Sequence, residues 1–287
     1  MGDSLQQGLL SPPVLAVLGL CIGSFLNVVI HRLPQMLERG WKIDSAEMLG
    51  LDPAKAAPPG EAVTLSRPRS RCPSCGHAIA WHENIPLVSY LWLRGRCSAC
   101  RTRISPRYPL VELLTALLFA AVGWRFGAQP AALLWCGLVA VLVALAGIDW
   151  DTTLLPDDLT LPLLWAGLVA AALGWTIPLS QALWGVVAGY LSLWSVYWIF
   201  KLATGKEGMG HGDFKLLAAL GAWLGWQMIL PVVLGASVLG AVVGLAMKAS
   251  NALREGRYVP FGPFLAGSGI VVMLSGPERV LGWLGWA

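Results

Sequence analysis

Long apolar runs separated by polar stretches dominate the hydrophobic pattern of this chain. Each run holds about 17 to 25 residues, the length that an α-helix needs to cross roughly 30 Å of hydrocarbon. The runs number eight and cover residues 11–30, 109–126, 131–149, 159–177, 180–200, 213–229, 231–248 and 260–277. The pattern therefore predicts an all-α fold, a polytopic membrane helix bundle of about eight transmembrane helices.

The two ends of the pattern need separate interpretation. The first run has no basic region before it and no clear small-residue cleavage site, so we expect a retained span and not a signal peptide. In the last run, Pro277, Glu278 and Arg279 precede a Trp-rich end. That end either spans the bilayer or lies in the interface.

Composition agrees with a membrane protein and excludes a soluble enzyme. Hydrophobic residues make up 56% of the 287 positions and charged residues only 13%, with a mean hydropathy of +0.65. Under the eight-span pattern, eighteen of the twenty basic residues fall on one side, in residues 32–108 and in the loops at 201–215 and 248–257. Since Lys and Arg accumulate in cytoplasmic loops, we place the N-terminus outside and residues 32–108 in the cytoplasm. The net charge of +4 then reflects topology, not nucleic-acid binding.

Two carboxylates lie at the ends of apolar runs. Asp149 closes the third run, and Asp213 opens the sixth within the sequence Gly210-His211-Gly212-Asp213. Two crossings separate them, so both are expected at the cytoplasmic membrane face and at similar depth, where they could meet across the bundle. An ionisable residue at membrane depth indicates function by default.

A close pair of carboxyl groups can share one proton, with one acting as base toward water while the other donates to a scissile carbonyl. The sequence therefore suggests an intramembrane aspartic protease, in which Gly210 and Gly212 allow a substrate strand to approach the loop. Two alternatives stay open. Asp213 could simply cap its helix, and four acids within ten residues could hold a divalent cation; these are Asp149, Asp151, Asp157 and Asp158.

Four cysteines in the polar stretch have metal-site spacing. Cys72 and Cys75 form one C-x2-C pair, and Cys97 and Cys100 form another after 21 intervening residues. This is the spacing of a four-thiolate zinc site, and four thiolates leave no position for water, so a zinc ion there would be structural. His77 and His82 are alternative ligands, whereas Cys21 and Cys136 fall in apolar runs and are interpreted as packing residues.

With these features in place, the chain resembles the bacterial type IV prepilin peptidase/N-methyltransferases, also called prepilin leader peptidases. The resemblance covers nearly the whole length. Besides Asp149, the two cysteine pairs and the loop at 210–213, it rests on residues 23–34 (GSFLNVVIHRLP), 71–75 (RCPSC), 81–86 (WHENIP), 94–97 (RGRC), 104–109 (ISPRYP) with Glu112, 148–151 (IDWD) and 155–157 (LPD).

The resemblance implies that Asp149 and Asp213 are the catalytic pair, with Gly210 and Gly212 shaping the second aspartate's loop. The implied substrates are type IV prepilins and type II secretion pseudopilins, whose short basic leader is cut after a Gly at the cytoplasmic face of the inner membrane. Acids near the site could meet that leader; the candidates are Asp151, Asp157, Asp158 and Glu207. Lys215 is interpreted structurally, as pairing with an acid or reaching the interface.

The resemblance also implies methylation of the new N-terminal residue by S-adenosylmethionine. The chain has no Gly-rich Rossmann fingerprint, so a donor site would lie in the 32–108 loop and adjoining helix ends. Polar and stacking contacts could come from Trp81, Glu83, Asn84 and Glu112. Two alternatives are a peptidase that lacks methyltransferase activity and a non-enzymatic scaffold of a secretion system.

These inferences give a three-part organisation of the chain. Residues 1–31 form a first transmembrane span, residues 32–108 a cytoplasmic zinc-binding loop domain, and residues 109–287 a transmembrane aspartic peptidase bundle. Because the apolar part of a substrate would have to reach the aspartates sideways, we expect an opening to lipid between the third and sixth runs. The oligomeric state does not follow from the sequence.

Overall fold

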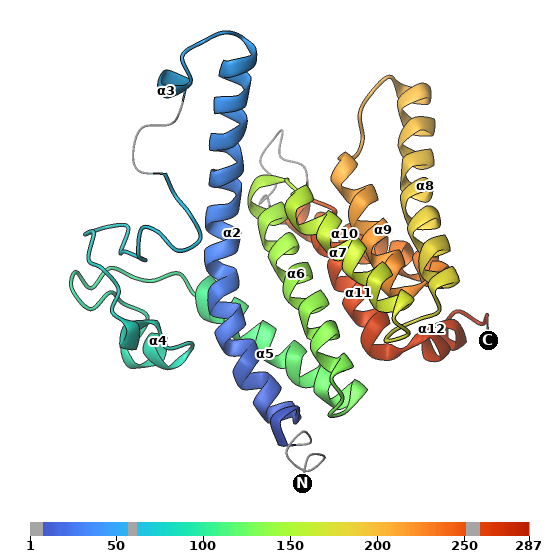
Figure 1. Ribbon diagram of the computed structural model, residues 1–287, viewed down its shortest axis with the longest axis horizontal. Coiled ribbons are helices and arrows are strands. Elements are labelled where there is room, and N and C mark those ends of the chain that lie inside the picture. The colour runs from blue at the N-terminus through green and yellow to red at the C-terminus, as the bar shows by residue number, and fades with distance from the viewer. Residues whose placement is uncertain (1–7, 57–61, 251–258, 287) are drawn as a thin grey trace. The chain divides into compact units, whose positions relative to one another are not determined.

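A computed structural model describes residues 8–56, 62–250 and 259–286 of the chain (Figure 1). Within these ranges every named element is a helix, and the only β pairings are two isolated bridges. The chain forms two compact units, residues 1–132 and 133–287. Two of the basic residues used for orientation, Arg254 and Arg257, lie outside the described ranges.

Two long helices that lie side by side build the first unit. Helix α2 (Pro12–Met48) packs along α5 (Arg107–Phe126), because small residues on α2 let the backbones approach. A Cβ on Gly19 would come within 2.7 Å of the Cα of Ala116. Near the start of α5, the Asn27 side-chain amide donates to the Tyr108 carbonyl at 3.1 Å. These contacts fix the register of the two helices.

The polar stretch between α2 and α5 is mostly irregular. It contains the short helices α3 (Pro53–Ala56) and α4 (Val88–Trp92) and a 3₁₀ turn, η1 (Trp81–Asn84). We call its residues 62–106 the cysteine loop. Ser89 joins η1 to α4, because its Oγ donates to the His82 carbonyl at 2.8 Å and accepts from the Ile85 amide at 2.9 Å. The Leu87 amide donates to Glu112 Oε2 at 2.9 Å, which ties the cysteine loop to α5.

The second unit is arranged around α9 (His211–Leu224), in which ten of the fourteen residues are buried. Helices α7, α8, α10 and α11 pack against it, and from α6 the Trp135 ring contacts that of Trp223. The remaining elements of this unit are α6 (Ala131–Thr152), α7 (Asp157–Ala172), α8 (Leu179–Thr204), η2 (Trp226–Met228), α10 (Ile229–Ala249), α11 (Gly262–Ser275) and α12 (Pro277–Trp283).

Glycines allow α8 to approach α9 closely. A Cβ on Gly185 would overlap the carbonyl of Gly221, and a Cβ on Gly189 would come within 2.6 Å of the Leu217 carbonyl oxygen. The four-residue spacing of Gly185 and Gly189 is the small-xxx-small pattern of tightly packed membrane helices. Because this contact involves backbone atoms, it holds α9, and so Asp213, at a fixed place.

The prediction of an all-helical, multi-span membrane protein is confirmed, but the count of eight spans is not. Among the described residues five helices are long and apolar enough to cross a bilayer, or six if α11 and α12 count as one bent span. Helices α7, α9 and α11 have only 16, 14 and 14 residues. At 1.5 Å per residue, fourteen residues extend about 21 Å, less than the roughly 30 Å of hydrocarbon.

Backbone breaks explain why apolar runs and helices differ. The predicted run 213–229 is interrupted at Gly225, whose φ of +85° ends α9. The run 260–277 ends in the same way at Gly276, after which α12 is bent by 107° from α11. In contrast, α2 continues 18 residues past the predicted run end at residue 30, to Met48.

Candidate active site and metal centre

Asp149 lies in the last turn of α6, and only 5% of its surface is exposed. Its Oδ2 accepts a hydrogen bond of 2.9 Å from the backbone amide of Gly262, the first residue of α11. The first amides of a helix have no partner within the helix, and they carry the positive end of its dipole. The start of α11 therefore supplies a matched donor to a carboxylate that is buried among apolar residues.

Asp213 lies in the first turn of α9 and is 7% exposed. Gly210 is the N-cap of this helix, with extended φ and ψ of −77° and 147°, a conformation open to any residue. A Cβ on Gly210 would lie 3.9 Å from Asp213 Oδ2, an ordinary contact. Gly212 is different, because a Cβ there would come within 2.7 Å of the Cβ of Leu155. Close packing thus requires the second glycine only.

The buried side chain of Leu155 brings the two acidic segments together. It packs against Gly212, next to Asp213, and its Cδ2 would lie 3.1 Å from a Cβ on Gly262, whose amide binds Asp149. Two buried carboxyl groups from α6 and α9 therefore share one site with the N-terminus of α11.

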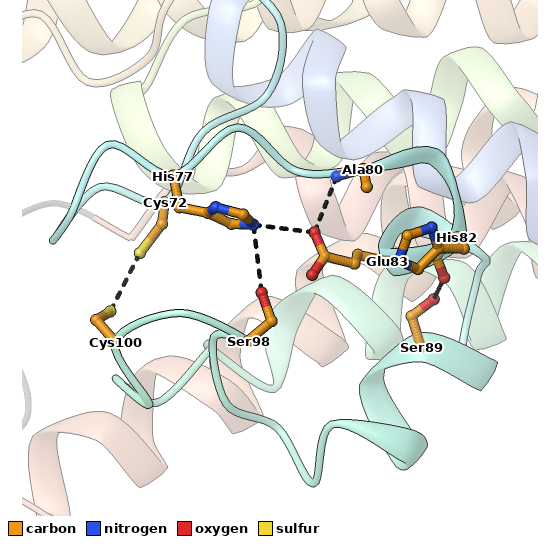
Figure 2. Close-up of polar contacts among 8 residues, drawn as sticks. All are labelled: Cys72, His77, Ala80, His82, Glu83, Ser89, Ser98 and Cys100. Carbon is orange, nitrogen blue, oxygen red and sulfur yellow. Dashed lines mark hydrogen bonds and ion pairs between the residues drawn. The ribbon is translucent and has the colours of Figure 1, made fainter.

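The four cysteine thiols converge at a second site, in the cysteine loop. The Sγ atoms of Cys72, Cys75, Cys97 and Cys100 all lie within 4.8 Å of one another, and all four are free of disulfides. Figure 2 shows Cys72 and Cys100, whose Sγ atoms are 3.8 Å apart. Four sulfurs bound tetrahedrally to zinc at about 2.3 Å would be about 3.8 Å apart. The donor set and its spacing therefore fit a structural zinc ion.

The two cysteine pairs form equivalent turns. The Cys72 amide donates to the His77 carbonyl, and the Cys97 amide donates to the Thr102 carbonyl, both at 2.9 Å. The fourth residue after the first cysteine of each pair has a left-handed backbone: Gly76 with φ +73° and Arg101 with φ +62°. Glycine adopts this conformation without strain, whereas arginine does not.

The alternative histidine ligands do not join the thiols. In Figure 2, His77 Nε2 lies 3.2 Å from Glu83 Oε2 and 3.3 Å from Ser98 Oγ, so its ring links the two turns to η1. Glu83 also accepts from the Ala80 amide at 2.9 Å. Hydrogen bonds from Ser98, Ala80 and His77 lower the pKa of Glu83 to about 2. Glu83, like Glu112, is thus bonded within the fold, while Trp81 and Asn84 are exposed.

Comparisons with known proteins decide the family. Residues 17–126 match the bacterial peptidase A24 N-terminal domain, and residues 136–245 match the type IV leader peptidase family. The chain belongs to this peptidase family. Proteins named prepilin leader peptidase/N-methyltransferase from Stutzerimonas stutzeri and Pseudomonas aeruginosa are 53% and 52% identical to the chain. The matched region spans 94% of the chain in both cases and 93% and 92% of the two relatives. No solved structure matches the chain.

Family membership confirms the resemblance inferred from the motifs and the prediction of an enzyme. Each of the two matched regions lies within one structural unit: the first contains the cysteine loop, and the second contains Asp149 and Asp213. In this chain, therefore, the thiol cluster and the carboxyl pair belong to different matched regions.

Gly262 is the residue at this carboxyl pair that sequence reasoning missed. It was included only as part of the last apolar run. Its signal is the sequence Pro260-Phe261-Gly262-Pro263, where a glycine at a helix start allows close backbone approach. A Cβ on Gly262 would come 2.5 Å from Asp149 Oδ2, so only glycine fits the observed geometry.

Two of the four acids considered for a basic leader are already paired. Asp157 accepts from Lys215 Nζ at 2.7 Å. Glu207 accepts from Lys201 Nζ at 2.8 Å, and this ammonium lowers the pKa of Glu207. Asp158 is exposed at the start of α7. Among the described residues only the four cysteines form a metal-ligand group, so the acids at 149–158 do not converge on a cation site.

Proposed function

We propose that Asp149 and Asp213 are the catalytic pair of an aspartic endopeptidase. It removes the short basic leader of type IV prepilins and type II pseudopilins after a Gly, at the cytoplasmic face of the bacterial inner membrane, with the N-terminus of the enzyme outside. The observation that carries the proposal is the convergence of two buried carboxyl groups, one at a helix end bonded to the Gly262 amide. Buried carboxyl groups without a metal partner are suited to proton exchange with water and a peptide carbonyl.

The carboxyl pair performs hydrolysis in two steps. One carboxyl group takes a proton from water as the water attacks the scissile carbonyl, while the other donates a proton to the carbonyl oxygen. As the C–N bond breaks, the first carboxyl group gives the proton taken from water to the leaving amine, and the second regains its proton from a hydroxyl of the tetrahedral intermediate, which restores the pair. The Gly262 amide fixes the Asp149 carboxyl group throughout, and Leu155 excludes bulk water from one side. Gly210, with no close neighbour beside it, leaves the N-cap of α9 open to the substrate backbone, whereas Gly212 is packed against Leu155.

Asp158 is a candidate acid for contact with the basic leader. It lies nine residues after Asp149, is exposed, and begins a helix beside the Asp157–Lys215 pair. Its charge acts at a distance from the reacting atoms, so it contributes to binding more than to chemistry. Charge reversal, Asp158→Lys, should raise KM for a basic leader several-fold while kcat changes little.

The cysteine loop supports the second reaction, N-methylation of the newly exposed residue with S-adenosylmethionine as donor. Zinc held by Cys72, Cys75, Cys97 and Cys100 would fold the cysteine loop, which has few buried apolar residues of its own. Such a zinc ion would be structural, since four thiolates would complete its coordination. Glu83 and Glu112 stabilise this fold through backbone amides and are not assigned to the donor.

The test compares wild type with Asp149→Asn and Asp213→Asn, purified in bilayers with a prepilin, and follows leader cleavage and methyl transfer by mass spectrometry. Asparagine keeps the shape of aspartate and cannot transfer the proton. Each substitution should reduce cleavage by at least about 10³-fold, the scale expected when an acid-base group is removed. Methylation of a pilin that already lacks its leader should persist.

The matched control is Glu278→Gln, which neutralises an exposed acid of the same unit in α12. It should leave cleavage unchanged. Cleavage that survives either aspartate substitution would refute the catalytic pair. Loss of both reactions together, in a variant that remains folded, would show that the two activities depend on one site.

A further inference from the structure

The short helix α4 exposes one apolar face. Val88, Leu91 and Trp92 are spaced i, i+3 and i+4, so they lie on the same side of the helix. Their exposed fractions are 55%, 73% and 78%. Ser89, on another side of α4, is buried. Large apolar side chains grouped in this way on a protein surface mark a binding surface.

This face cannot turn inward without unfolding the cysteine loop. Ser89 binds both the His82 carbonyl and the Ile85 amide, so it ties α4 to η1 on one side. On the other side, the Gly95 amide donates to the Tyr90 carbonyl at 2.8 Å, and the Ile104 amide donates to the Gly95 carbonyl at 2.7 Å. Helix α4 is therefore held rigidly between η1 and the second cysteine pair, with its apolar face outward.

The contact to α5 places α4 at the level where the chain enters the membrane. The Leu87 amide, just before α4, donates to Glu112, which is the sixth residue of a candidate membrane span that begins at Arg107. Five residues of helix correspond to about 7.5 Å along its axis. The start of α4 is thus beside the first turns of a membrane helix, at the depth of the headgroup region.

The chemistry of the face and its border fits lipid. Tryptophan is favoured at the membrane–water interface, where its ring meets both apolar chains and polar headgroups. A second exposed tryptophan, Trp81, lies in η1, which Ser89 joins to α4. Arg94 and Arg96 follow α4 directly and are exposed, so their charges would meet the phosphates of anionic lipids.

We propose that the face formed by Val88, Leu91 and Trp92, with Arg94 and Arg96 at its border, inserts into an anionic lipid surface. This contact anchors the cysteine loop to the bilayer and limits how far the thiol cluster can move from the membrane. The inference rests on the membrane character of α5 and does not depend on the catalytic pair.

The test replaces Leu91 with the photoreactive residue benzoylphenylalanine in the full-length chain. The protein is placed in vesicles of phosphatidylethanolamine and phosphatidylglycerol, irradiated, and analysed for adducts by mass spectrometry. The matched control carries the same residue at Met48, which is 87% exposed at the end of α2. Met48 is 21 residues beyond Asn27, which binds the start of α5, so it extends about 32 Å from that level.

Lipid adducts at position 91 should exceed those at position 48 roughly tenfold. The same excess should appear with the photoreactive residue at Trp92, which checks that one substitution has not misplaced the loop. Adducts from position 91 to residues 133–287 or to a second copy of the chain would overturn the proposal, as would equal lipid labelling at positions 91 and 48. Labelling that does not decrease in phosphatidylcholine vesicles would refute the role of the arginines. Zinc content and leader cleavage report separately on folding and catalysis.

Discussion

Replacing Gly262 with alanine is expected to impair leader cleavage severely by displacing the Asp149 carboxyl group. Built onto the backbone, the added Cβ would lie 2.5 Å from Asp149 Oδ2, 3.1 Å from its Cγ and 3.1 Å from Leu155 Cδ2. Ordinary van der Waals contact begins at 3.4 Å, so the oxygen must move by about 0.9 Å, the difference between 3.4 and 2.5 Å. Neither neighbour can move easily, since both side chains are buried.

Two independent estimates give the size of the effect. The displacement breaks the 2.9 Å bond from the Gly262 amide, and a hydrogen bond to a charged group contributes about 1.5–3 kcal/mol, a factor of roughly 10 to 150. A misplacement of about 1 Å at a reacting group costs about 10²-fold in rate. We therefore expect Gly262→Ala to reduce kcat for cleavage by about 10²-fold, with a smaller change in KM.

The assay measures cleavage of a prepilin by the purified variant in bilayers, together with its thermal unfolding. Gly267→Ala is the matched control, because Gly267 lies in the same helix and a Cβ there would meet nothing within 4 Å. It should retain wild-type cleavage. Gly262→Ala that is folded and cleaves within about threefold of wild type would refute the assigned position of Asp149 against α11.

Two further substitutions test other contacts. Gly185→Ala should lower the free energy of unfolding by about 1–3 kcal/mol, because its Cβ would overlap the Gly221 backbone. The control Gly244→Ala in α10, where a Cβ would meet nothing within 4 Å, should not change it. Equal unfolding temperatures for the two variants would contradict the close approach of α8 and α9. In the cysteine turns, Gly76→Ala should weaken zinc binding about tenfold, since a left-handed alanine costs about 1–2 kcal/mol, and Arg101→Gly should strengthen it by a smaller factor. Competition with a chelator measures both zinc affinities. Affinities equal to that of the wild type would show that the turns relax without strain.

Local features of the fold were predictable from the sequence. The cysteine pairs could be recognised because both ligands of each pair lie on one tight turn, so the spacing alone determines where the thiols point. Helix type and membrane character also followed from apolar runs. The ends of the helices did not, because a run of apolar residues does not show where the backbone turns. Gly225 lies between Leu224 and Trp226 and ends α9 through a positive φ.

Contacts between distant segments were only partly predictable. Counting crossings predicts that Asp149 and Asp213 lie on one side of the bilayer, and this placement stays a prediction. In the structure the two segments meet at Leu155. The count carries no information about which backbone group satisfies a buried carboxyl group. The donor to Asp149 is the amide of Gly262, 113 positions away. Hydrophobic periodicity does not predict such a pairing.

The two helices that begin at the carboxyl pair are also among the shortest in the second unit. Helix α9 carries Asp213 in its first turn, and α11 gives its first amide to Asp149, yet each has only 14 residues. A helix that crossed the whole bilayer would have its first amides at the membrane surface, where water competes for them. A shorter helix can start within the unit, as α11 does at the buried Gly262, so that an unpaired amide and the helix dipole act on a buried carboxyl group. The short length of α9 and α11, which keeps α9 from counting as a membrane span, therefore allows a polar site to form within an apolar bundle.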